Sequence, residues 1–145
     1  MSLAEAVARV EGAIYPTLEA VVRAAPVDLR DLLSGITAVQ CSAEQFEREA
    51  KQLSAEEAKV LLIATLHRSL AHSVEIMPIA QARELTTQFI AAAGADARYF
   101  SNCDVTDELN GVGGWRFMVT SYTFESVLYC ITQEECALLV AVDED

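Results

Sequence analysis

Cations are scarce in this sequence. Lysine occurs only at positions 51 and 59, and lysine and arginine together number 10 against 22 aspartates and glutamates, a net charge of −12. Residues 98–145 carry only Arg98 and Arg116 against nine carboxylates. Such a surface repels phosphate backbones and argues against nucleic acid as a direct partner. It attracts a basic protein, although the same charge also serves simply to keep a hydrophobic chain dispersed.

Long hydrophobic runs are missing too, although apolar residues make up 52% of the chain. The longest candidate, Val60–Leu66, ends at His67 and Arg68, well short of the roughly 18 apolar residues that mark a membrane span. Residues 2–12 lack the basic start of a secretory signal. We therefore expect no membrane contact and a cytoplasmic location. The length of 145 residues fits one domain, 1–145.

Metal and cofactor motifs are also absent. The four cysteines, at 41, 103, 130 and 136, include no C-x-x-C pair of the zinc-binding kind. In a chain without an export signal we expect them to be buried free thiols. His67 and His72 lie five residues apart, about 140° around a helix, so they do not converge on one ion. We expect no metal and no cofactor.

The polar segment 104–114 comes nearest to a ligand-binding loop. Its oxygen ligands lack the alternation and the closing glutamate of a calcium loop. Its glycines, at 111, 113 and 114, precede an expected strand, whereas phosphate loops open a helix. The nucleophile elbow G-x-S-x-G does not occur. A small, acidic chain without these motifs is typical of a protein that acts by binding.

Two apolar runs near the C-terminus, Phe124–Ile131 and Cys136–Val142, predict a β-hairpin. With residues 133–134 at the turn, Ile131 pairs with Cys136. Alternate side chains then form two faces, and both are largely apolar, so each needs a cover. We expect helices from earlier in the chain to cover one face. Further helices, a loop or a second copy of the chain cover the other, and we favour a hairpin central to its own domain.

Helical patterns fill the chain up to residue 94. Apolar positions from Leu3 to Val21 recur every three or four residues and predict one long helix, kinked near Pro16 and ending by Pro26. Further helices open at the capping residues Asp28, Ser42 and Ser54, and at Pro78. The second ends before Cys41, the third contains Phe46–Leu53, the fourth covers about 55–76, and the last ends at Gly94.

Strand patterns follow the helices. Besides the hairpin, Arg98–Cys103 and Trp115–Thr120 are expected strands, the latter directly beside the hairpin. A helical part of about 3–94 thus precedes a strand part of about 98–145. This order predicts an α+β fold in which an N-terminal bundle of about five helices packs on a C-terminal antiparallel sheet of three to four strands.

The leading functional hypothesis is a non-enzymatic, acidic protein-binding module, such as an inhibitor or immunity-type protein that blocks a basic partner. In composition the chain resembles small bacterial toxin-neutralising proteins, without any shared motif. Exposed aromatic side chains anchor many interfaces, and acidic surfaces steer basic partners. The expected partner-binding residues are Asp104, Asp107, Glu108, Trp115, Asp143, Glu144 and Asp145.

Two alternatives remain open. One is a small enzyme or ligand-binding domain with a pocket near His67, although a core histidine bonded to a hydroxyl or carbonyl explains that position equally. The other is a structural homodimer joined through the second hairpin face, where Val127 and Leu138 lie. Trp115 is likewise either a core anchor or a binding residue.

Overall fold

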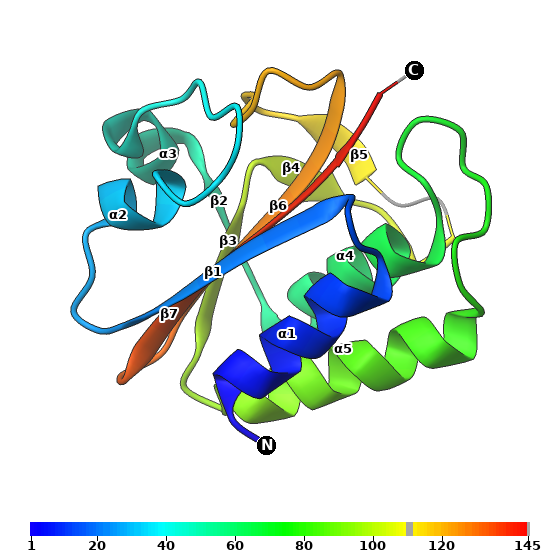
Figure 1. The fold of residues 1–145 in the computed structure, drawn as a ribbon, viewed down its shortest axis with the longest axis horizontal. Helices are drawn as coiled ribbons and strands as arrows, with labels where there is room; N and C mark the ends of the chain where they lie inside the picture. The colour runs from blue at the N-terminus through cyan, green and yellow to red at the C-terminus, as the bar shows by residue number, and fades with distance from the viewer. Residues whose placement is uncertain (110–111, 145) are drawn as a thin grey trace.

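The structure is a computed structural model that describes residues 1–109 and 112–144 (Figure 1). Five helices and seven strands follow one another within these residues. In chain order they are α1 (Leu3–Ala13), β1 (Leu18–Ala24), α2 (Leu29–Leu33), α3 (Ala43–Glu49), β2 (Lys51–Leu53), α4 (Ala55–His67), α5 (Ile79–Ala93), β3 (Arg98–Ser101), β4 (Cys103–Val105), β5 (Val112–Trp115), β6 (Phe124–Ile131) and β7 (Glu135–Asp143).

A five-stranded antiparallel sheet forms the centre of the molecule, with strand order β1-β7-β6-β3-β2. One face carries α1, α4 and α5, and the other carries α2 and α3 (Figure 1). The expected combination of helices and antiparallel strands is therefore correct. The expected bundle is not, because the helices are divided between the two faces and the first part of the chain supplies both edge strands. The sheet also has five strands, one more than the largest number expected.

The hairpin of β6 and β7 has the predicted register, with Ile131 opposite Cys136. Its two strands lie in the middle of the sheet, as favoured from the sequence. Val127 and Leu138, on the second face, are fully buried in the core formed with α2 and α3. This face is therefore covered by the chain's own helices, and it is not available to a second copy.

The expected first helix is half wrong. Helix α1 ends at Ala13, and residues 18–24 form β1, which pairs with β7 from Leu18 opposite Ala141 to Ala24 opposite Glu135. Pro16 interrupts the helical pattern. The β-branched Val21 and Val22 then suit a strand, and pairing with the free edge of β7 outweighs their helix-like spacing.

Two other expectations about strands fail. The segment expected to form a strand at Trp115–Thr120 contributes only its first residue to β5, which pairs with β4 in a separate two-stranded sheet. The place beside β6 belongs instead to β3. The expected strand Arg98–Cys103 is divided at Asn102 between β3 and β4. The three-residue strand β2 was not expected, because so short a segment carries no measurable alternation.

Helix starts, and the end of α5, follow the sequence closely. Asp28 and Ser42 accept hydrogen bonds from the backbone amides of Arg30 and Gln45, and Ser54 forms a complete capping box with Glu57. Gly94 caps α5 with a φ of 89°, a conformation that favours glycine. None of the described helices has the length and apolar character needed to cross a bilayer.

Helix α4 is shorter than expected, ending at His67 rather than near residue 76. Residues 68–77 instead form an irregular connection to α5. The Ser69 hydroxyl accepts hydrogen bonds from the amides of His72 and Val74, and such local bonds offer the backbone an alternative to the helix. This connection, which we call the 68–77 loop, is central to the candidate site.

Candidate functional site

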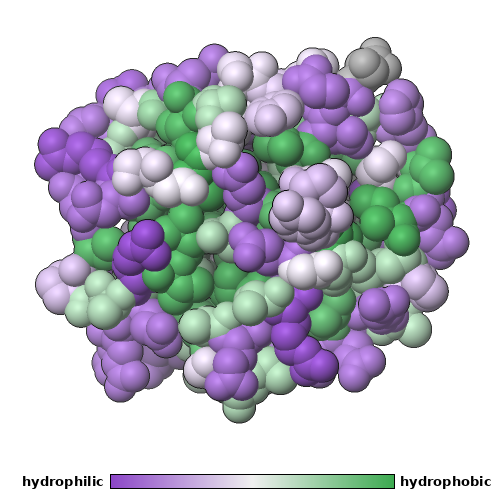
Figure 2. Space-filling model, in the orientation of Figure 1, coloured by the Kyte–Doolittle hydropathy of each residue, from purple (hydrophilic) through white to green (hydrophobic). Residues whose placement is uncertain are grey.

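Exposed hydrophobic side chains gather at one end of the molecule, around the 68–77 loop. Of the six large hydrophobic side chains that are exposed in the described part of the chain, five belong to this end. Figure 2 shows hydrophobic surface on the right of the view, over the connection between α4 and α5. We call this set the hydrophobic end; it comprises Tyr15, Val74, Ile76, Leu109 and Trp115.

Two cavities connect these residues. One of about 300 Å³ lies between the end of α1, the 68–77 loop and the end of β7, with Tyr15 and Ile76 in its wall. A smaller one, of about 70 Å³, has Leu109 and Trp115 in its wall. Both are also lined by Thr65 and residues 68–70. The two cavities therefore share part of their lining and border four of the five residues of the hydrophobic end: Tyr15, Ile76, Leu109 and Trp115.

An arginine lies between the two cavities. Arg68 lines both, and its Nη1 donates a hydrogen bond of 2.7 Å to the Ser73 carbonyl. Its Nε is buried and has no hydrogen-bond partner among the described residues. A buried donor without an acceptor is costly.

Trp115 was predicted to be either a core anchor or a binding residue, and its side chain has features of both. Its indole Nε1 donates a 2.6 Å hydrogen bond to the Glu125 carbonyl, and its ring packs on Phe124 with centroids 6.0 Å apart. The side chain is nevertheless 38% exposed. Phe124 pairs with Asp143 across the hairpin, so the tryptophan lies close to the acidic end of the chain.

Two of the predicted acidic residues are engaged in ion pairs. Glu108 binds Arg83 of α5 through its Oε2 atom, and Asp104 lies 3.4 Å from Arg116. Exposed pairs of this kind contribute little to stability. Their charges are nonetheless balanced locally, which weakens the case for these two residues as attractors of a basic partner.

The C-terminal carboxylates are different. Asp143 accepts a hydrogen bond of 3.1 Å from the Ala71 amide in the 68–77 loop. Glu144 accepts bonds from the amide and the hydroxyl of Thr123, at 3.1 and 2.8 Å. All of these donors are neutral, and no described cation forms an ion pair with either carboxylate. Their negative charges are therefore free to act on a partner.

The remaining predicted residues are Asp107 and Asp145. Asp107 accepts a hydrogen bond of 2.9 Å from the amide of Leu109, a member of the hydrophobic end. Asp145 lies outside the described residues, as do residues 110 and 111 of the polar segment 104–114. The structure therefore brings Trp115, Asp143 and Glu144 together and places Asp107 beside Leu109.

A buried carboxylate organises the segment behind Trp115, and the sequence interpretation missed it. Glu125 on β6 is fully buried and accepts four hydrogen bonds: from the amides of Val119 and Thr120, the Thr120 hydroxyl and the Asn102 side chain. These bonds fix the chain between Trp115 and the hairpin. A signal was present, because Glu125 is the only carboxylate on a hairpin face that is otherwise apolar.

His67 is a core residue, as one of the two interpretations stated. Its side chain is 4% exposed, and Nδ1 lies 2.8 Å from the Met77 carbonyl. It lines neither cavity of the hydrophobic end. Across residues 1–109 and 112–144, no three His, Cys, Asp or Glu side chains are grouped to hold a metal ion.

The four cysteines are buried and unpaired. Burial raises the pKa of Cys41 to about 11 and that of Cys130 to about 12. It also raises the pKa of Cys103 and of Cys136. Raised pKa values leave little of the reactive thiolate at neutral pH.

We therefore expect all four thiols of the native protein to react slowly with a thiol reagent at mildly alkaline pH. The same thiols should react fast and completely after unfolding in guanidinium, because unfolding restores ordinary pKa values and access. Absorbance of the released chromophore measures both rates. A thiol that reacts at the rate of a free cysteine in the native protein would contradict the burial described above.

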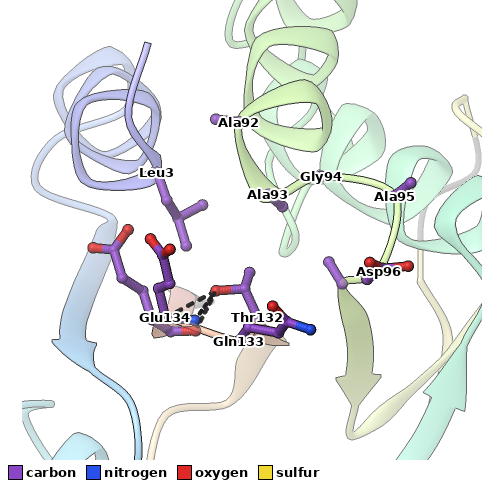
Figure 3. A pocket seen from close by; sticks show the side chains of 11 residues that line it. Leu3, Ala92, Ala93, Gly94, Ala95, Asp96, Thr132, Gln133 and Glu134 are labelled. Carbon is purple, nitrogen blue, oxygen red and sulfur yellow. Dashed lines mark hydrogen bonds between the residues drawn. The ribbon is translucent and has the colours of Figure 1, made fainter.

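A further cavity, of about 230 Å³, lies at the opposite end of the molecule. Figure 3 shows it between Leu3 of α1, the end of α5 and the β6–β7 turn, with the carboxylates of Asp96 and Glu134 nearby. Thr132 closes the turn by accepting hydrogen bonds from the amides of residues 134 and 135. Met1, two residues before Leu3, is the single exposed large hydrophobic residue of the described chain that lies outside the hydrophobic end, so the cavity beside Leu3 provides a reference surface.

No known protein family matches this chain, and no curated protein or solved structure is significantly similar to it. The geometry of the surface itself is therefore the basis for a functional proposal.

Proposed function

We propose that this protein is a non-enzymatic binding module that blocks a basic protein partner through its hydrophobic end. The observation that supports this most directly is the gathering of five of the six exposed large hydrophobic side chains around one loop. Contiguous exposed apolar surface on a protein of this size commonly marks an interaction site. The two cavities beneath it offer places where side chains of a partner insert.

Electrostatics favours a basic partner. The net charge of −12 attracts cations from a distance. At the surface itself, Asp143 lines the larger cavity, and Glu144 follows it directly. A lysine or arginine of the partner would contact these carboxylates while an apolar neighbour enters the cavity.

The mechanism would be occlusion. An interface that buries hydrophobic anchors in cavities excludes water from the central contacts, and the charged rim accelerates association. The partner's own functional surface would lie beneath this contact and be inaccessible while the complex lasts. No chemical step by this chain is required.

A capture experiment tests the proposal. The tagged protein should retain one basic protein in stoichiometric amount from an extract of its native source at low salt. Retention should fall at about 0.5 M salt, where exposed charges are screened beyond a few Å. The retained protein, identified by mass spectrometry, is then purified and its Kd measured by titration calorimetry. If nothing is retained in stoichiometric amount, the proposal is wrong.

Matched variants show whether this end makes the contact. Asp143→Asn/Glu144→Gln removes the two C-terminal carboxylates of this end and should raise the Kd about tenfold. The control, Asp96→Asn/Glu134→Gln, removes two carboxylates at the opposite end (Figure 3) and should leave the Kd unchanged. Tyr15→Ala, at a side chain that is 79% exposed, should weaken binding through lost apolar contact. Equal effects of the two charge pairs would show that net charge alone acts and that this surface is not the interface.

A further inference from the structure

The strand β1 is a long edge of the central sheet, and its outer side is open. β1 pairs with β7 alone among the described strands, and it runs across the front of the sheet in Figure 1 with no element over its outer edge. Just beyond the two ends of β1, the Thr17 carbonyl accepts a hydrogen bond from the Val142 amide of β7, and the Ala25 amide donates to the carbonyl of Glu134, the residue before β7. Since successive residues of a strand direct their backbone groups to opposite sides, residues 18, 20, 22 and 24 direct theirs outward.

Two of these outward backbone groups form hydrogen bonds with side chains of the same molecule. The carboxylate of Glu11 on α1 accepts a 2.8 Å hydrogen bond from the Ala20 amide. The guanidinium of Arg23 donates a 2.9 Å bond to the Val22 carbonyl. Exposed strand edges attract further strands, and natural proteins blunt them with charged side chains. The other outward groups of β1 have no hydrogen-bond partner in the described part of the chain.

We infer that β1 pairs with β1 of a second copy, giving a two-fold symmetric dimer with a continuous ten-stranded sheet. In an antiparallel pair centred on Val21, Ala20 lies opposite Val22 of the second copy, and Leu18 lies opposite Ala24. These are all residues whose backbone groups point outward, so each such pair exchanges two hydrogen bonds. The inference does not depend on the proposed function, because β1 and the hydrophobic end use different residues.

The charge pattern of β1 selects this register. With Val21 at the two-fold axis, Glu19 of each copy lies directly opposite Arg23 of the other. Opposite charges at facing positions stabilise a strand pair, and like charges destabilise it. Glu19 already accepts a 2.7 Å bond from the Thr37 amide through Oε2, which fixes its side chain and leaves Oε1 for the arginine. A shift by two residues in either direction loses both of these charge pairs.

The Ala20 amide and the Val22 carbonyl, which are bonded to side chains in the isolated chain, become partners of one another in the dimer. In the pair of Ala20 with Val22, the Ala20 amide donates to the Val22 carbonyl of the second copy. Glu11 and Arg23 would therefore release the groups they occupy, and Arg23 would turn to Glu19. The monomer keeps its edge satisfied in water, and the dimer replaces these side-chain bonds with main-chain bonds.

Helix α1 leaves room for this contact. On its far flank Arg9 contacts Gln88 of α5, while Glu11 marks the flank that borders the β1 edge. Ala4 and Ala8 share the Glu11 flank on a helix of 3.6 residues per turn, and both are exposed. Small side chains there allow the α1 helices of the two copies to approach without obstructing the strands.

Sedimentation equilibrium of the purified protein, over a wide range of concentrations, tests the inference. We expect a reversible dimer. Glu19→Lys and Arg23→Glu each place like charges opposite one another twice, so each should raise the dimer dissociation constant about tenfold or more. The two variants mixed together should form a heterodimer, because lysine at 19 then faces glutamate at 23. The double variant, Glu19→Lys/Arg23→Glu, should dimerise alone.

Circular dichroism of each variant shows whether it is folded. If Glu19→Lys fails to fold after losing its bond to Thr37, Arg23→Glu still decides, because Arg23 is exposed and its one side-chain hydrogen bond within the described residues is to its neighbour's carbonyl. A wild-type protein that remains monomeric at every concentration would overturn the inference. So would a dimer whose dissociation constant is unchanged by Arg23→Glu.

Discussion

Replacing Glu125 by glutamine should lower the free energy of unfolding by roughly 3 kcal/mol, although the change preserves the shape of the side chain. Both carboxylate oxygens accept two hydrogen bonds: Oε1 from the amide and hydroxyl of Thr120, at 2.8 and 2.6 Å, and Oε2 from Val119 and Asn102, both at 2.6 Å. A glutamine supplies one oxygen and one NH2 group. Whichever way it is oriented, its NH2 faces at least one backbone amide that requires an acceptor.

The alternatives for relaxation are few. The Thr120 hydroxyl rotates and accepts from the new NH2 group, but the Thr120 amide beside it cannot. The Asn102 amide is held by a second bond of 3.0 Å to the Phe117 carbonyl. Removing a buried charge does relieve desolvation. We expect that gain to be the smaller effect, because four donors already replace the water around this carboxylate.

Urea denaturation followed by fluorescence of the single tryptophan, Trp115, measures the loss directly. Glu134→Gln is the matched control, since it removes the same charge at the exposed end of the same hairpin, and it should change stability by no more than about 0.5 kcal/mol. If Glu125→Gln is as stable as this control, the four hydrogen bonds do not hold the 117–120 segment.

Local patterns predicted the elements that depend on local interactions. The hairpin register followed from alternation and a polar turn, and Asp28, Ser42 and Ser54 marked helix starts because their side chains bond to amides two or three residues away. Long-range pairing was not predictable in this way. β1 reaches β7 across more than a hundred residues, and its helix-like spacing gave no indication of that partner.

The candidate site was predicted only in part for the same reason. The residue types enriched at interfaces pointed to Trp115 and the acidic C-terminus, and the structure brings these together through the Phe124–Asp143 strand pair. The fourth helix was expected to continue to about residue 76, and a continuous helix gave no indication that Val74 and Ile76 would be exposed on a loop. Only the early end of α4 exposes them and opens the two cavities.

Replacing Phe46 by alanine should lower the free energy of unfolding by about 3–5 kcal/mol. Phe46 on α3 is 1% exposed and meets Phe117 and Tyr129 edge to face, with ring centroids 5.6 and 5.8 Å away. A helix of seven residues is not stable on its own. We therefore expect α3 to depend on this one anchor, and its loss should expose the second face of the hairpin.

Phe46→Leu is the matched variant, because it keeps most of the apolar volume while losing the aromatic contacts, and its cost should be less than half that of alanine. Chemical denaturation gives both values, and binding of a dye specific for exposed apolar surface reports on the uncovered sheet. Equal stability of Phe46→Ala and the wild type would mean that α3 does not cover this face. The face would then need another cover, because the side chains that β6 and β7 direct to it are apolar apart from the buried Glu125.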